Sequence, residues 1–162
     1  MFIKKPAVVF DCNIYIQIVL NPHGTAKRCY DLVDKGEVEL FVTQEILEET
    51  AEVLSRPKIK KLVPALTKEM IDEFLEDVAS KAIVIKNIPE EFEYKRDPDD
   101  TIYINLAIVI PADYLISLDK DLLDLMKEKY KESREFMRRY PFIKVLTPKE
   151  LLEKITEEQK SA

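Results

Sequence analysis

Residues 95–121 read KRDPDDTIYINLAIVIPADYLISLDKD, and this stretch decides the fold. It begins with an acidic group, continues through a long apolar segment and ends with a second acid pair, Asp119 and Asp121. Asp97-Pro98 is typical of a helix N-cap followed by proline at the first helical position. Residues 115–118 are short and almost wholly apolar, as expected of a strand that is covered on both faces. The stretch therefore predicts a helix, a tight turn and a buried strand, with the second acid pair just past the carboxyl end of the strand.

The apolar residues 102–110 are compatible with a helix or a strand, because many are β-branched and periodicity does not separate the two. We favour a helix, since a capping signal precedes the segment and a strand must follow it at once. Asp100 then falls in the first turn, beside the positive end of the helix. Asp99 is expected to be a solvated acid of the same turn.

The composition is that of a soluble globular protein, because 46% of the 162 residues are hydrophobic and 35% are charged. A chain of this length is expected to form a single domain, residues 1–162, with a sizeable core. The net charge of −6 argues against a general polyanion-binding surface. It does not exclude an enzyme that acts on nucleic acid, because bound metal ions would neutralise several of the acids.

Cysteine usage and hydropathy indicate a reduced, intracellular and cytoplasmic protein. Cys12 and Cys29 are too few for a disulfide framework or a zinc site. The first residues show no signal-peptide pattern. The most apolar stretch, residues 102–118, is interrupted by Asn105 and Asp113, so we expect no membrane span and no membrane partner.

Apolar runs and capping signals alternate along the chain. Ala7-Val8-Val9-Phe10 is continuously apolar and ends at Asp11, which is typical of a central parallel strand. Thr43 is expected to cap a helix that Arg56-Pro57 stops, and Thr147 to Glu150 form a capping box. This alternation predicts a three-layer α/β/α domain with a mostly parallel central sheet. Strands are expected at 7–10, 40–42, 82–85, 115–118 and 143–146, and helices at 25–35, 44–54, 67–80, 97–110, from about 122, and from 148.

Asp11, Asp100 and Asp119 all fall at expected strand ends or at the start of the helix beside one, where α/β sheets place their ligands. Crowded carboxylates raise one another's pKa unless a cation neutralises them. Mg²⁺ and similar hard ions prefer oxygen ligands, and two such ions roughly 3.5–4 Å apart stabilise the attacking and leaving oxygens at phosphorus. His23 is the single histidine. A two-histidine acid–base ribonuclease is therefore excluded.

Several of these polar residues also have a purely structural interpretation. Asp97 is more typical of an N-cap than of a ligand, and Asp121 or Asp11 could cap the helix that follows it. Asn13 is typical of a turn residue, or of a side chain that orients a metal-binding carboxylate without binding the metal itself. The glutamates of residues 45–52 fit a solvated helix face, and their spacing alone does not choose a ligand among them.

Four segments in order, VVFDCN, TQEILEETAEVL, RDPDDTIYINLA and YLISLDKDLL, resemble the PIN domain. The resemblance extends from about Ala7 to Leu152. It is strongest to the prokaryotic PIN proteins that act as toxins of toxin–antitoxin pairs, the VapC-like ribonucleases. It implies a Mg²⁺- or Mn²⁺-dependent ribonuclease in which water attacks an RNA phosphodiester. The metal ligands and catalytic acids that it implies are Asp11, Glu49, Asp100 and Asp119, with Asp121 as an auxiliary ligand and with Asn13 and Ser117 as supporting polar residues.

The substrate and partners follow from the same resemblance and from the basic, aromatic residues 127–140. This run fits a solvated helix face or a surface for a phosphate backbone. The protein partners considered are an antitoxin and a second copy of the chain. A non-catalytic PIN-like scaffold that binds RNA or protein, and a phosphoaspartyl receiver-type module, are the alternative functions. Candidate RNA contacts are Lys95, Arg96, Lys127, Arg134 and Arg138.

Overall fold

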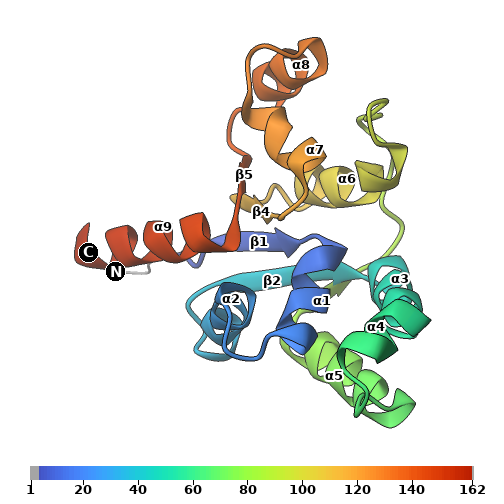
Figure 1. Cartoon of the computed structure of the whole chain (residues 1–162). Coiled ribbons are helices and arrows are strands. Elements are labelled where there is room, and N and C mark those ends of the chain that lie inside the picture. Colours follow the sequence, from blue (N-terminus) through green and yellow to red (C-terminus); the bar gives the residue numbers. More distant parts are fainter. Residues whose placement is uncertain (1–3, 162) are drawn as a thin grey trace.

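The computed structural model describes residues 4–161 and is built on a five-stranded sheet in the order β3-β2-β1-β4-β5 (Figure 1). All the strand pairs of this sheet are parallel, and the mostly parallel sheet of the prediction is confirmed. The first strand, β1, pairs on one side with β2 and on the other with β4. Strand order therefore reverses direction at β1, where open α/β sheets form their ligand crevice. The strands are β1 Ala7–Phe10, β2 Glu39–Thr43, β3 Ile83–Ile85, β4 Tyr114–Ile116 and β5 Lys144–Leu146.

Helices flank this sheet, which confirms the three-layer α/β/α class. Helix α6 packs on β1, β2 and β4, whereas α9 packs on β4 and β5 and also contacts α2. The helices are α1 Cys12–Leu20, α2 Thr25–Asp34, α3 Gln44–Leu54, α4 Pro57–Leu62, α5 Lys68–Lys81, α6 Thr101–Val109, α7 Lys120–Leu123, α8 Lys131–Arg139 and α9 Pro148–Ser161, with 3₁₀ turns η1 Pro98–Asp100 and η2 Asp124–Met126.

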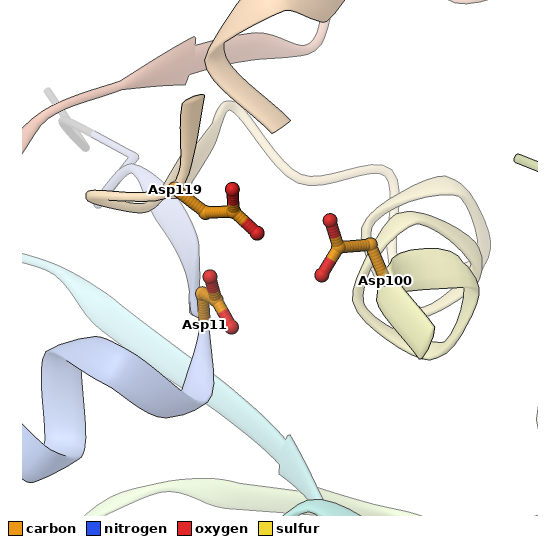
Figure 2. A group of neighbouring side chains, drawn as sticks. All are labelled: Asp11, Asp100 and Asp119. Carbon is orange, nitrogen blue, oxygen red and sulfur yellow. The ribbon is translucent and has the colours of Figure 1, made fainter. Parts of the chain in front are cut away.

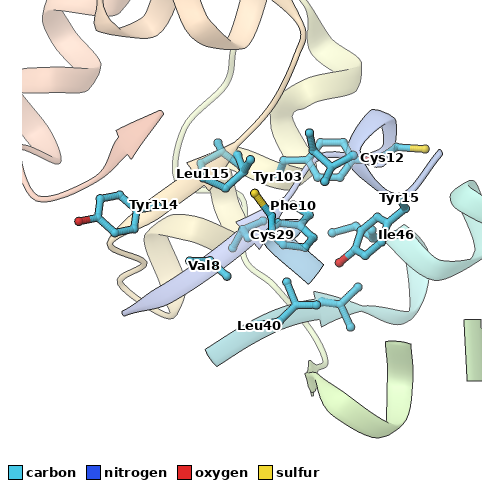
Figure 3. Packing of buried hydrophobic residues seen from close by; sticks show 14 of the residues in the cluster. Val8, Phe10, Cys12, Tyr15, Cys29, Leu40, Ile46, Tyr103, Tyr114 and Leu115 are labelled. Carbon is cyan, nitrogen blue, oxygen red and sulfur yellow. The ribbon is translucent and has the colours of Figure 1, made fainter. Parts of the chain in front are cut away.

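The core is centred on β1, all four of whose residues are buried. Figure 3 shows Phe10 of this strand beside Tyr15 of α1, and their ring centroids lie 5.7 Å apart. Tyr103 of α6 belongs to the same cluster. A strand buried on both faces is apolar at every position, which is why the AVVF run was recognisable in the sequence.

The capping signals at Thr43 and at Thr147–Glu150 are confirmed. The Thr43 side chain accepts a hydrogen bond from Ile46 N at 3.1 Å and begins α3. At α9 the capping box is reciprocal, because Glu150 N donates to Thr147 Oγ1 at 3.2 Å and Thr147 N donates to Glu150 Oε1 at 3.0 Å. These bonds satisfy amides that the first turn of a helix otherwise leaves unpaired.

Three local expectations need correction. Residues 12–20 form α1, a helix that the sequence pattern does not predict, because a helix that is apolar on nearly every face lacks the usual periodicity. Asp97 stands at the N-cap position of η1, yet its side chain makes no capping hydrogen bond. The strand expected at 115–118 instead spans Tyr114–Ile116, although Ser117 N still donates a hydrogen bond to Leu146 O at 3.0 Å.

An irregular segment, residues 86–97, connects β3 to η1. The side chain of Asn105 in α6 forms hydrogen bonds with the backbone of this segment. Asn105 is buried, and its Oδ1 accepts hydrogen bonds from Glu91 N at 2.7 Å and Phe92 N at 2.9 Å. Its Nδ2 donates to Phe92 O at 2.9 Å. One amide side chain therefore substitutes for a missing strand partner along this segment.

Asn105→Ala is expected to destabilise the fold by about 2–4 kcal/mol, because it leaves buried backbone groups of Phe92 without partners. Urea unfolding would measure the change. Gln44→Ala is the control, since this exposed amide makes a single 3.4 Å contact to Glu48 and should change stability by at most about 0.5 kcal/mol. Equal effects of the two substitutions would contradict the assignment.

Candidate metal centre

Three carboxylates converge at the carboxyl edge of the sheet. Asp11 directly follows β1, Asp119 lies three residues beyond the end of β4, and Asp100 ends η1 at the start of α6. One oxygen of each lies within 4.8 Å of an oxygen of the other two, and Figure 2 shows the three side chains pointing toward one another. Phe10 and Ile116 are register partners in adjacent strands, so the chain delivers Asp11 and Asp119 to the same point of the edge.

Ser117 fixes the position of two of these aspartates. Its Oγ donates to Asp11 Oδ2 at 2.7 Å and accepts a hydrogen bond from Asp119 N at 2.9 Å. Asp11 is also tied to β4 through its own N–H, which donates to Ile116 O at 2.9 Å. The Asn13 side chain is more distant, because its Oδ1 accepts from Leu118 N at 3.4 Å.

The three carboxylates carry a charge that the protein leaves uncompensated. Burial, together with the charges of Asp119 and Glu49, raises the pKa of Asp11 to about 6, against the opposing hydrogen bond from Ser117. Burial and the neighbouring Asp11 and Asp119 also raise the pKa of Asp100. Among the described residues, no lysine or arginine lies within 4.0 Å of these three carboxylates.

Asp100 gives the sharpest evidence that a cation belongs here. The residue is 6% exposed, and its Oδ2 is buried without a hydrogen-bond partner among the described atoms. A buried carboxylate oxygen is costly to leave unpaired. A hard divalent ion accepts several carboxylate oxygens at once, so the donor set fits a divalent cation of this kind.

A second carboxylate group shares Asp119. Oxygens of Asp97, Asp119 and Asp121 also lie within 4.8 Å of one another. Burial and the charges of Asp119 and Asp121 raise the pKa of Asp97. Asp119, rather than Asp121, caps the following helix, since its Oδ1 accepts from Asp121 N at 2.9 Å. The capping interpretation of Asp121 was therefore wrong. Asp11 and Asp97 do occupy N-cap positions, of α1 and η1, but neither side chain makes the capping hydrogen bond.

Glu49 is not part of either carboxylate group. It is exposed on α3, and its Oε2 accepts a hydrogen bond from the Tyr103 hydroxyl at 2.9 Å. Its charge contributes to the raised pKa of Asp11, so it lies on the same edge. Its role as a ligand stays a prediction. Cys12 is buried and its pKa is raised to about 11, which agrees with a packing role rather than a nucleophilic one.

The structure connects two of the candidate RNA contacts to an acid that the sequence analysis missed. Asp124 is fully buried, and it lies 2.6 Å from Arg96 Nη2 and 2.8 Å from Lys127 Nζ. These cations hold the pKa of Asp124 well below its usual range. In the sequence, Lys120 and Lys127 lie at positions i−4 and i+3 from Asp124, and this spacing could have indicated that Asp124 forms ion pairs.

The remaining candidate RNA contacts lie on or beside α8. Lys95 N donates to Glu132 Oε2 at 2.9 Å, and Arg134 Nη1 donates to Glu128 O at 2.7 Å. Arg138 is exposed. Contact of these side chains with RNA stays a prediction.

A parallel α/β sheet with carboxylates converging at its switch point is the arrangement expected of a metal-dependent phosphodiester hydrolase. The PIN domain family matches residues 7–121, and the chain belongs to this family. PIN domains are generally nucleases, which favours this class over a phosphoaspartyl receiver.

A relative from the archaeon Methanocaldococcus jannaschii, named uncharacterized protein MJ1680, is similar over nearly its whole length. It is 31% identical over 150 residues, which cover 92% of this chain and 91% of the relative. Within residues 4–161, no helix combines the length and the apolarity needed to cross a membrane.

Proposed function

We propose that the protein is a Mg²⁺- or Mn²⁺-dependent endoribonuclease whose metal centre is formed by Asp11, Asp100 and Asp119. The observation that carries the proposal is the unpartnered, buried Asp100 oxygen beside two other carboxylates. When bound, the ion would lower the pKa of water and neutralise charge on phosphate oxygens. Glu49 is proposed as a further acid of the same site, on the strength of its charge coupling to Asp11.

The residues around the ion have separate tasks in this proposal. Ser117 holds Asp11 and the Asp119 backbone in one arrangement, so that the carboxylates meet the ion without reorganisation. Tyr103 orients Glu49 through its hydroxyl. The carboxylates repel an RNA phosphate until the ion is in place, so we infer that metal binding precedes productive substrate binding.

The basic residues of α8 and the loop before it support a phosphodiester substrate. Residues 127–140 carry six lysines and arginines and three glutamates, whereas the whole chain has a net charge of −6. Figure 1 shows α8 standing above α7, which follows Asp119 directly. A basic surface beside an acidic centre would hold an RNA backbone while the metal acts on one phosphate. RNA rather than DNA is proposed from the resemblance to PIN ribonucleases.

A role as a toxin is proposed from the same resemblance. An antitoxin would silence such a nuclease by covering the carboxylate edge, and a second copy of the chain is a further partner to test. Co-purification with a chromosomally adjacent small protein, and loss of cleavage in that complex, would support the toxin role. Cleavage that proceeds unchanged in every complex would favour a housekeeping nuclease.

Cleavage of a mixed panel of fluorescent RNAs by purified protein tests the activity. We expect cleavage with Mg²⁺ or Mn²⁺, none with EDTA, and none with Asp11→Asn, which controls for a contaminating nuclease. RNA that binds but is never cut under any metal condition would contradict the proposal and favour a non-catalytic scaffold.

A further inference from the structure

The second carboxylate group differs from the first because a cationic side chain already contacts it. Arg96 Nε lies 2.9 Å from Asp121 Oδ1, and the Arg96 side chain is 27% exposed. Of the described residues, Arg96 is the one lysine or arginine within 4.0 Å of a carboxylate in either group. The positive charge therefore reaches the Asp97–Asp119–Asp121 group and not the Asp11–Asp100–Asp119 group.

The Arg96 guanidinium also contacts two further residues, Asp124 and Tyr130. Its Nη2 donates to Asp124 Oδ2 at 2.6 Å, and Asp124 is fully buried. The ring of Tyr130 lies 4.6 Å from the guanidinium carbon. Two neighbouring donors of one planar group thus bind two different carboxylates, which a lysine ammonium cannot reproduce in the same geometry.

The backbone on both sides of this contact is also fixed. The Tyr94 hydroxyl donates to Asp121 O at 2.6 Å, and Lys95 N bonds Glu132 on α8. Ser133 Oγ, also on α8, donates to Asp124 O at 2.7 Å. Arg96 is consequently bonded to both acids, and the backbone of its neighbours along the chain is bonded as well.

We propose that the Arg96 guanidinium serves as the built-in counter-charge of the Asp97–Asp119–Asp121 group, so that the centre takes one divalent ion at Asp11, Asp100 and Asp119 rather than two. Asp121 is then the partner of Arg96 and not a ligand of the ion. This inference rests on the proposed metal centre. It also gives Arg96 a place in the site other than the direct RNA contact suggested by sequence.

The number of ions bound per chain tests this role without depending on catalysis. Calorimetric titration of the native protein with Mn²⁺ is expected to give about one ion per chain. Arg96→Gln removes the guanidinium charge and frees Asp121, so about two ions are expected. The double variant Arg96→Gln with Asp121→Asn should return to about one, because the freed acid is gone.

Lys120→Gln is the matched control for the loss of one positive charge. Lys120 Nζ lies 3.0 Å from Asp124 Oδ2, and within residues 4–161 it forms an ion pair with no other acid. This variant should keep about one ion per chain. Circular dichroism of each variant checks that the fold is retained. Asp121→Asn alone, an exchange at a side chain that is 33% exposed, should also keep about one ion, and it serves if Arg96→Gln fails to fold.

The outcomes separate this inference from the proposed function. Two ions in the native protein, or a single ion in a folded Arg96→Gln, would overturn the counter-charge role and leave the nuclease proposal intact. Loss of the ion in Asp121→Asn would overturn it as well, because Asp121 would then be a ligand. A native protein that binds no Mn²⁺ would overturn the metal centre and this inference together.

Discussion

Asp100→Asn is expected to lower the rate of RNA cleavage at saturating Mn²⁺ by about 10²–10³-fold or more, which is the scale of losing one preorganised electrostatic group. The Asp100 side chain is buried, and within residues 4–161 its Oδ2 has no hydrogen-bond partner that would keep it out of a metal site. An asparagine offers one neutral oxygen in place of a carboxylate. Initial rates on a single fluorescent RNA, taken over a range of Mn²⁺ concentrations, would separate weaker metal binding from slower chemistry.

Asp99→Asn is the matched control. It makes the same chemical change at the preceding residue, but Asp99 is exposed and belongs to neither carboxylate group. Its cleavage rate should remain within about twofold of the native rate, since an exposed charge near the site is screened by solvent. Equal losses in the two variants would show that Asp100 acts only through the general negative charge of the η1 turn.

The same Asp100→Asn substitution is expected to stabilise the metal-free protein by about 1–3 kcal/mol near pH 7, given that one pKa unit corresponds to roughly 1.4 kcal/mol. Burial and the charges of Asp11 and Asp119 penalise the ionised Asp100 carboxylate. The asparagine amide would instead donate to these neighbouring acids. Thermal unfolding in EDTA measures the gain, and excess Mn²⁺ should reverse the order because the native protein then gains more from metal binding than the variant does.

The gain should depend on pH in a defined direction. The folded-state pKa of Asp100 is raised above its unfolded value of 3.8, so the native state binds the proton more tightly. The penalty is absent when both states are protonated, grows as pH rises above the unfolded pKa, and is complete above the folded pKa. The advantage of Asp100→Asn in EDTA should therefore shrink toward pH 4. An advantage that is constant from pH 4 to 8 would contradict an electrostatic origin.

The sheet and its main acids were predictable because their signals are local. The apolar run 7–10 ending at Asp11 predicted both a central strand and a carboxylate at its carboxyl end. The run at residues 115–118 did the same for Asp119, although the strand itself ends at Ile116. Parallel strands end on one edge, so the meeting of these two aspartates followed from the fold class alone.

Other features were not predictable, because they depend on partners distant in sequence. Helix α1 is buried on several sides between the sheet and its neighbours, so its apolar residues lack the one-sided pattern that marks a helix. The sequence does not distinguish Asp124 from the other charged residues of its region. Its buried position and its bond to Arg96, 28 residues earlier, become apparent only in the structure. Choosing Glu49 among the acids of residues 45–52 required the family resemblance. The structure then places Glu49 near Asp11 without bringing it into the carboxylate group.

The most direct test of the metal centre is calorimetric titration of the native protein and of Asp100→Asn with Mn²⁺ in the absence of RNA. We expect the native protein to bind Mn²⁺ with measurable affinity, and the variant to bind it at least about tenfold more weakly while unfolding as cooperatively as the native protein. Native protein that binds no divalent ion, or a variant that binds it with native affinity, would contradict a metal centre at Asp11, Asp100 and Asp119.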